Sequence, residues 1–438
     1  MEINTKASWI ERATGAKATE LSAALISFAY FFCLLASYYV LRPIRDEMAI
    51  QIGQKNLAEL FTWVFLTMLA VVPLFGWLMA TFPRKKILPW LYLFFVANLI
   101  GFYAVMGSAG EQTPIIARVF YIWVSVYNLF VISVFWSFMA DLFDSDQAKR
   151  LYGFIAAGGT VGALAGPIIT TTLVASLGAK HLMLVSGGFL LAAVGLIFAL
   201  IRWEKSSAID AVAKAKNDSE DVPIGGSVWA GIVDVVRSRY LLAICVFLFA
   251  YAILSSLLYF AQVEMLPKAI ASSVERTQLL AKVDLVVNCM TLFVQVFAFG
   301  ALVQRLGTRF MLVAMPVVSI VGFVALALNP VLGVLLVFGV MRRAGEYAIS
   351  KPARETLFNV LPPEQKYKAK NVIDTLVHRT GDVSSTWILT GLKSIGMNLS
   401  SMSWLAVPIG LVWLATAWWL GGEAKQRQQS LEGNDGAR

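Results

Sequence analysis

Long apolar runs separated by short polar segments recur along the whole chain. Each run holds about 20 predominantly apolar residues, the length that an α-helix needs to cross the hydrocarbon core of a bilayer. The pattern predicts an all-α, polytopic membrane protein with about twelve transmembrane helices. These predicted spans lie approximately at residues 21–41, 58–82, 87–107, 115–141, 151–176, 180–201, 240–262, 279–303, 309–328, 330–350, 372–393 and 400–420.

The longest polar break, residues 202–239, divides the spans into two sets of six. A Glu-Met pair at 47–48 recurs at 264–265, and a Leu-Phe pair at 142–143 recurs at 357–358. Two-residue matches arise easily by chance, so their common offset of about half the chain matters more than either match. We therefore predict two six-helix pseudo-repeats in a bundle that resembles the major facilitator superfamily. The predicted parts are a cytoplasmic N-terminal segment (1–20), two six-helix halves (21–202 and 239–421), a cytoplasmic linker (203–238) and a cytoplasmic tail (422–438).

Composition agrees with this class, since 58% of the residues are hydrophobic and only 14% are charged, with a mean hydropathy of +0.71. Basic residues gather in alternate loops, and by the positive-inside rule those loops and both termini are cytoplasmic. The net charge of +9 is then mostly topogenic, and no nucleic-acid partner is expected. We predict a monomer in the lipid bilayer of the bacterial inner membrane. The basic loops contain Arg84 to Lys86, Lys149 and Arg150, Arg305 and Arg309, and residues 342–370.

The sequence contains few of the residue patterns that catalytic sites require. There is no Gly-Lys-Ser/Thr phosphate loop, and the chain has only two histidines and no cysteine pair. Cys33, Cys245 and Cys289 all lie within apolar runs, which argues against a disulfide framework or a metal site. We expect a non-enzymatic protein without a cofactor or a metal, whose partner is a small-molecule solute.

The first apolar run ends in a cluster of charges of both signs around Pro43. Ionisable groups at membrane depth cost about 2.5–3.5 kcal/mol each at a helix centre, so they usually mark a solute path or pair with one another. Arg42 alone is explained equally well as a headgroup anchor. Arg45 and Asp46, crowded beside it, favour a polar solute or a gate.

A second polar region covers the eleventh predicted span. Asp374, His378 and Asp382 repeat at every fourth position, so they form a stripe on one helix face that must meet the bundle interior or water. Arg379 beside them is able to pair with a carboxylate or to contact an anionic solute. Lys370, at the start of this span, is a further candidate for an anion contact.

Three motifs together resemble the nucleotide translocase family: the ATP/ADP antiporters of plastids and obligate intracellular bacteria and their bacterial relatives, the NTP/NDP exchange transporters. The similarity extends over most of the predicted twelve-helix region. Each motif is short, but their order and spacing are typical of the family. They are Leu-Arg-Pro-Ile-Arg-Asp at 41–46, Val-Glu-Met-Leu-Pro-Lys at 263–268, and Lys-Pro-Ala-Arg-Glu at 351–355 followed by Lys-Tyr-Lys-Ala-Lys-Asn-Val-Ile-Asp at 366–374.

The resemblance implies roles for some residues and departs from the family at others. Arg45 matches the family's basic residue in the first span, and Glu264 with Lys268 matches its acidic motif after the seventh. The fourth span has no interior carboxylate, although the translocases carry a glutamate there. Asp382 stands where they place a lysine, and this reversal is worth several kcal/mol against an anion at about 4 Å. These departures weigh against strict ATP/ADP exchange.

Together these observations predict a secondary active transporter of a nucleotide or a related anionic, phosphorylated metabolite. The alternatives are a proton-coupled carrier of another polar solute, and a lipid flippase or sensor on a transporter scaffold. The predicted solute-binding residues are Arg42, Arg45, Glu264, Lys268, Lys370 and Arg379, and the predicted coupling or gating residues are Asp46, Asp374 and Asp382.

Overall fold

The computed structural model describes residues 16–17, 19–81, 84–109, 114–207, 235–362, 369–370, 373 and 377–435, in which the regular elements are helices and no strand occurs. In this part of the chain ten helices are long and apolar enough to cross a membrane. The prediction of an all-α, polytopic membrane protein is therefore confirmed.

The tenth predicted span and the described part of the eleventh are helical, but their α-helices are shorter than those of the ten. The tenth consists of α12 (Leu332–Gly345), the π-helical segment η4 (Glu346–Ser350) and α13 (Lys351–Thr356). Of the eleventh, the structure describes α15 (His378–Ser394), which is strongly amphipathic.

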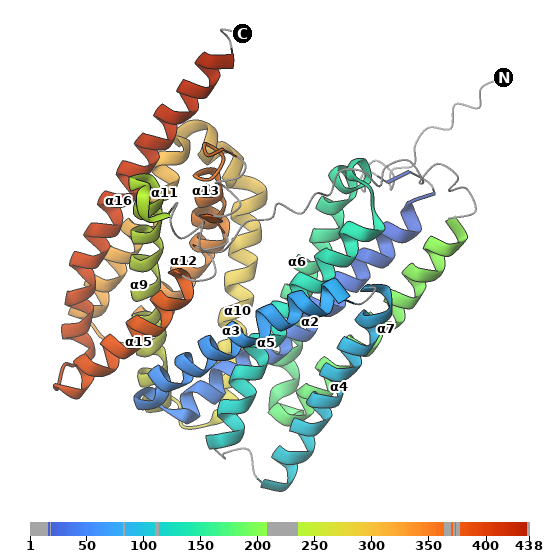
Figure 1. The fold of residues 1–438 in the computed structure, drawn as a ribbon. Coiled ribbons are helices and arrows are strands. Elements are labelled where there is room, and N and C mark those ends of the chain that lie inside the picture. The colour runs from blue at the N-terminus through green and yellow to red at the C-terminus, as the bar shows by residue number, and fades with distance from the viewer. Residues whose placement is uncertain are drawn as a thin grey trace. The chain divides into compact units, whose positions relative to one another are not determined.

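The helices belong to two compact units, of which the first comprises residues 1–52, 66–220 and 272–285. The central helix of this unit is α2, which packs on α5, α6 and α7 (Figure 1). Its helices are α2 (Leu21–Ile52), most of α3 (Leu57–Thr81), α4 (Arg84–Ala109), α5 (Pro114–Leu142), α6 (Ser145–Leu177), α7 (Ala179–Ser207) and the first part of α10 (Ser273–Phe293).

Helix α6 approaches α2 closely because glycines line the contact. A Cβ atom on Gly158 would lie 2.3 Å from the backbone oxygen of Phe28, and one on Gly162 would lie 2.4 Å from that of Phe32. Any side chain would force the helices apart, so the small residues at every fourth position set their separation.

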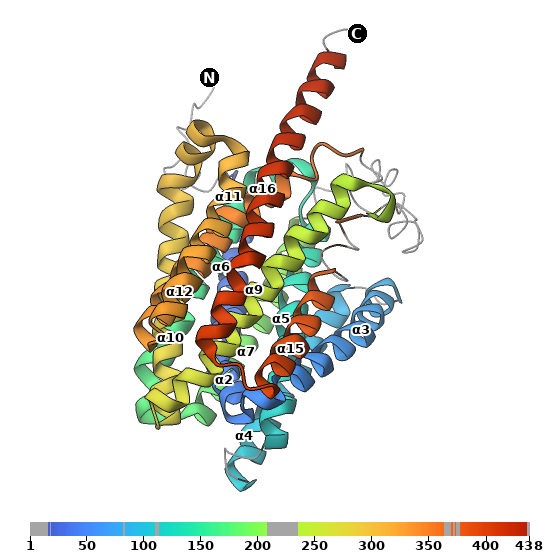
Figure 2. The ribbon, with the colours of Figure 1, turned by 90° about the vertical axis from the view of Figure 1, so that its left-hand side faces the viewer.

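The second unit comprises residues 53–65, 221–271 and 286–438. Its central helix is α9 (Arg239–Ala269), which packs on α12, α15 and α16 (Leu399–Asp435). Figure 2 shows α16 beside α9 and α11 (Phe299–Leu328). Within α11, Gly307 has a φ of 74°, a left-handed conformation that suits glycine and breaks this helix in two. The short segments η1 (Gln54–Asn56) and η3 (Val294–Ala298) complete the unit.

Helices α3 and α10 each contribute to both units. Residues 57–65 of α3 belong to the second unit, and the first turns of α10 belong to the first. The predicted boundaries of the two six-helix halves stay a prediction, since most of the linker lies outside the described residues.

Candidate functional site

The charged cluster near Pro43 lies inside a helix. Helix α2 runs through Pro43 and ends at Ile52, so the predicted end of the first span at residue 41 is wrong. A proline removes only one backbone N–H donor. In a helix bundle, neighbouring groups are able to donate to the carbonyl that loses its partner. Arg42, Arg45 and Asp46 are thus carried on the last turns of a helix that is mostly buried in the first unit.

A buried ion pair of the first unit joins Glu47 of α2 to Arg276 of α10. The Arg276 guanidinium donates from Nη2 to Glu47 Oε1 at 2.6 Å and from Nε to Oε2 at 2.9 Å. The two side chains are 9% and 2% exposed, respectively. A forked arginine–carboxylate contact of this kind fixes the relative position of its two helices.

A second ion pair connects the same helices. Arg42 Nε lies 3.7 Å from Asp284 Oδ2, and Arg276 and Asp284 are eight residues apart on one face of α10. Sequence reasoning placed Arg42 correctly near charged neighbours but missed both partners on α10. The signal was present, because Asp284 is a carboxylate inside the eighth predicted apolar span.

Arg45 and Asp46 contact each other, Arg45 Nη2 donating to Asp46 Oδ1 at 2.7 Å. The Arg45 guanidinium also lies over the ring of Tyr121 in α5, 5.2 Å from its centroid. Arg45 Nε also donates to Asp46 Oδ1, at 3.0 Å, so this carboxylate occupies one edge of the guanidinium.

In the second unit, Glu264 near the end of α9 accepts hydrogen bonds from three elements. The donors are Lys268 Nζ at 2.7 Å in the same helix, Lys393 Nζ at 2.9 Å in α15, and Gln54 Nε2 at 2.8 Å in η1. The structure therefore brings the predicted pair Glu264 and Lys268 together and adds Lys393, which sequence reasoning missed.

Asp382 lies in α15 beside two of its predicted neighbours. Its Oδ2 is 3.4 Å from His378 Nδ1 and 4.0 Å from Arg379 Nη1. Lys370 pairs instead with Glu355 of α13. Asp374 lies outside the described residues.

A further set of charges emerges on α12, η4 and α13. Arg342, Glu346 and Arg354 are buried there, although residues 342–370 were predicted to form a basic cytoplasmic stretch. Arg342 also lies within the predicted tenth span, 330–350, and the helix that continues through it packs against α9 and α11. Arg342, Glu346 and Arg354 are four and eight residues apart, a spacing that predicts one helix face, and the sequence analysis did not use it.

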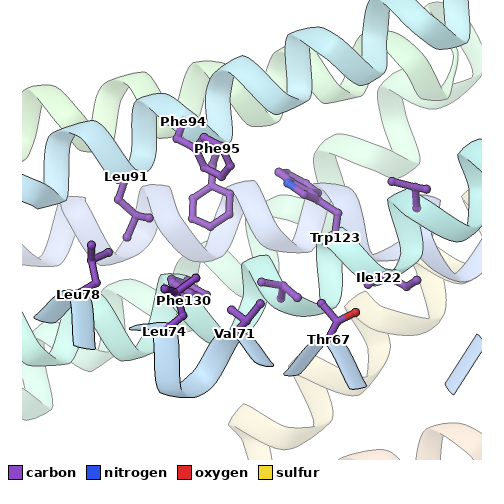
Figure 3. A pocket seen from close by; sticks show the side chains of 12 residues that line it. Thr67, Val71, Leu74, Leu78, Leu91, Phe94, Phe95, Ile122, Trp123 and Phe130 are labelled. Carbon is purple, nitrogen blue, oxygen red and sulfur yellow. The ribbon is translucent and has the colours of Figure 1, made fainter. Parts of the chain in front are cut away.

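The first unit also contains a cavity of about 480 Å³ between α3, α4 and α5. Figure 3 shows Leu91, Phe94 and Phe95 of α4 opposite Val71 and Leu74 of α3. No charged residue lines it, so it offers no partner to an anionic group. Its mostly apolar lining is suited to hydrocarbon groups.

Comparison with known proteins decides the class of this chain. Residues 21–341 match the model of the Major Facilitator Superfamily. The chain belongs to this superfamily. Solved members share the fold: the D-xylose-proton symporter superposes with a TM-score of 0.62 at 12% identity, covering 92% of this chain and 97% of that one. A bacterial homologue of the iron transporter ferroportin, in an inward-facing state, gives 0.60 at 15% identity, covering 94% and 99%.

Two curated relatives are named ADP,ATP carrier protein 1. That of Chlamydia muridarum is 22% identical over an aligned length of 471 residues. The alignment covers 91% of this chain and 88% of the relative. That of Chlamydia trachomatis serovar D is 23% identical over 470 residues, with the same coverage. The resemblance to nucleotide translocases drawn from the motifs is thus confirmed. This superfamily member is a multi-pass membrane protein and a secondary transporter.

Proposed function

We propose that this superfamily member carries a nucleotide or a related anionic, phosphorylated metabolite across the inner membrane by alternating access, with NTP/NDP exchange as its mode. The observation that carries the proposal is similarity to the ADP,ATP carrier proteins over 91% of this chain. No enzymatic step is part of the proposal. The solute is its small-molecule partner, and the protein works as a monomer.

Four cations that contact carboxylates support an anionic solute. Arg42 and Arg45 in the first unit, and Lys268 and Lys393 in the second, each contact a carboxylate. A phosphate group presents the same kind of acceptor oxygen, so it is able to replace a carboxylate on such a cation without leaving the charge unpaired.

Exchange in proteoliposomes tests this function. Vesicles loaded with an unlabelled nucleotide or sugar phosphate should take up the labelled compound in exchange for at least one such solute. Arg45→Gln or Glu264→Gln should lower that rate at least about tenfold if one charge-assisted contact of about 1.4 kcal/mol or more is lost. Arg309→Gln is the matched control. The Arg309 guanidinium carbon lies over the ring of Trp418, 3.6 Å from its centroid, and Arg309 is not one of the predicted solute-binding residues. Absence of uptake for every nucleotide and sugar phosphate tried would refute the proposal.

Orientation is tested separately. By the positive-inside rule, the basic loops predict that both termini are cytoplasmic. A reporter fused at Asp146, just inside the start of α6, should therefore read cytoplasmic, and one at Gly53 between α2 and η1 should read external. The opposite reading at Gly53 would overturn the topology.

A proton-coupled carrier of another polar solute is the second candidate. The observation that favours it is Asp382, a titratable carboxylate beside His378 and Arg379 at a position where the translocases carry a lysine. Asp382→Asn should then keep solute counterflow but lose uptake driven by a pH gradient, because an amide does not titrate. Nucleotide exchange that is robust and unchanged in this variant would exclude the second candidate.

A further inference from the structure

Four polar side chains form a buried stripe along one helix of the second unit. Arg342, Glu346, Ser350 and Arg354 occur at every fourth position, and they are 4%, 7%, 1% and 8% exposed, respectively. Arg342 belongs to α12, the next two residues begin and end η4, and Arg354 belongs to α13. We call these four residues the α12–α13 stripe.

The π-helical segment keeps the stripe on one side. In an α-helix a four-residue step overshoots a full turn by about 40°, so three steps would carry Arg354 about 120° away from Arg342. A π-helical turn contains more residues and therefore a smaller rotation per residue, which reverses part of that drift. Such segments often occur at functional sites, and this one lies in the middle of the stripe.

The charges of the stripe are poorly compensated. Among the described residues, Arg342, Glu346 and Arg354 form no ion pair, and Arg342 Nε, Arg342 Nη1, Glu346 Oε2 and Arg354 Nε have no hydrogen-bond partner. Arg342 keeps one hydrogen bond, from Nη2 to Ser255 Oγ of α9 at 2.7 Å. Buried charges without partners are costly, so their presence inside a membrane helix points to a ligand.

Arg342 has the surroundings of an oxyanion subsite. Its guanidinium lies 5.2 Å from the ring centroid of Tyr251. Two of its nitrogens, Nε and Nη1, carry N–H groups that have no acceptor among the described residues. A planar fork with free donors beside an aromatic face suits phosphate or carboxylate. Arg354 lies roughly 18 Å farther along the helix axis, too far to share one such group with Arg342.

Glu346 is the acidic side chain of the α12–α13 stripe nearest to Arg342. It lies one turn from Arg342, about 6 Å along the axis, and shares the surroundings of Tyr251 with Arg342 and Asp382. An ionised Glu346 repels an incoming oxyanion, whereas a protonated one leaves the positive charge of Arg342 uncompensated. Anion binding and proton binding therefore favour each other.

We propose that Arg342, Tyr251 and Ser255 form an anion-binding subsite in the second unit, whose occupation is linked to protonation of Glu346. The proposal rests on the proposed function for the anionic class of the solute. It adds a site that no family motif assigned, and it predicts co-transport of a proton with the anion.

Other ionisable groups surround Glu346, and any pH dependence must be separated from theirs. The elements packed against η4 are α11, α12, α13 and η3, and α9 and α15 bring Tyr251, His378 and Asp382 near it. His378 contacts the ring of Tyr251 from α15. The ionisable residues on the packed elements are Arg305 and Arg309 of α11, Arg342 and Arg343 of α12, and Lys351, Arg354 and Glu355 of α13.

Thermal-shift titrations of the purified full-length protein test the subsite. The probes are ATP, glucose 6-phosphate, inorganic phosphate and malate, with glucose as the uncharged control, at about pH 6 and about pH 8. At least one anion should stabilise the native protein, with an affinity that falls by up to about tenfold per pH unit, the limit for one linked proton. Phosphorylated probes distinguish a phosphate ligand from the carboxylate of malate.

Three variants separate the roles. Arg342→Gln should lose at least about tenfold in anion affinity at both pH values. Glu346→Gln should bind the anion and lose the pH dependence, whereas His378→Gln should retain it. Because neither Arg342 nor Glu346 has an ion pair to break, both variants should melt close to the native protein without ligand. Arg309→Gln should match the native protein throughout.

The outcomes of this experiment differ from those of the exchange assay. Loss of malate binding in Arg342→Gln, without any nucleotide uptake, supports the subsite and refutes nucleotide exchange. Nucleotide exchange and ATP binding that survive in Arg342→Gln refute the subsite alone. Failure of every anion to stabilise the native protein, or a pH dependence that persists in Glu346→Gln, also overturns it.

Discussion

The buried pair of Glu47 and Arg276 allows a quantitative test of what holds α10 against α2. Three hydrogen bonds of 2.6–3.1 Å join the two side chains, which are 2% and 9% exposed. Removing one partner leaves the other as an uncompensated buried charge, which typically costs about 3–5 kcal/mol. We expect Glu47→Gln, which keeps the shape and some hydrogen bonding, to lose about 3 kcal/mol of unfolding free energy.

The double variant Glu47→Leu/Arg276→Met should behave differently. It removes both charges and replaces them with apolar groups of similar size, so its stability should lie within about 1 kcal/mol of the native value or above it. The cycle of the two single variants and the double variant then gives a coupling energy of about 3 kcal/mol or more.

Unfolding by denaturant in detergent, followed by tryptophan fluorescence, measures these values. Lys149→Gln serves as the control, because Lys149 and Asp146 form an exposed i,i+3 pair in α6 whose loss should cost no more than about 0.5 kcal/mol. Loss of less than about 1 kcal/mol in Glu47→Gln, with additive effects in the cycle, would refute a buried, coupled pair.

Three further predictions concern stability. Two guanidinium hydrogen bonds from Arg150 lower the pKa of Glu20 to about 2, so the Tm advantage of the native protein over Glu20→Gln should be full above about pH 4.5 and vanish as the pH falls towards 2. Gly158→Ala should lower the Tm by overpacking worth about 1–3 kcal/mol, whereas Gly153→Ala in the same helix, with nothing within 4 Å, should not. Gly307→Ala should cost about 1 kcal/mol, measured by denaturant unfolding, because of its positive φ; an unchanged value would show that this turn is not left-handed.

Much of the fold was predictable because the bilayer imposes a simple requirement. A spanning helix needs about 20 apolar residues, and most of the predicted spans match helices in the structure for that reason. The end of α2 was not predictable from apolarity. Its last turns carry Arg42, Arg45 and Asp46, and the charges that keep them buried come from other elements as well as from α2 itself.

In the candidate sites too, contacts within one helix were predictable and contacts between helices were not. Neighbours in the sequence, such as Arg45 with Asp46 and Glu264 with Lys268, were identified because helical spacing alone brings them together. Partners such as Arg276 and Lys393 depend on how distant helices pack, which no local pattern encodes. For Arg342 a pattern was available, but the rule that assigns basic residues to cytoplasmic loops outweighed it.

The Glu-Met pair that occurs twice in the sequence has different surroundings at its two positions. Glu47 is held by a bidentate guanidinium, whereas Glu264 is 12% exposed and shared between the ammonium groups of Lys268 and Lys393. A planar fork fixes one geometry, but ammonium groups on flexible stems exchange partners readily. The two equivalent carboxylates should therefore differ in phenotype: loss of Glu47 should mainly lower stability, and loss of Glu264 should mainly lower transport. Glu264→Gln that unfolds as easily as Glu47→Gln, with normal transport in its folded fraction, would contradict this division.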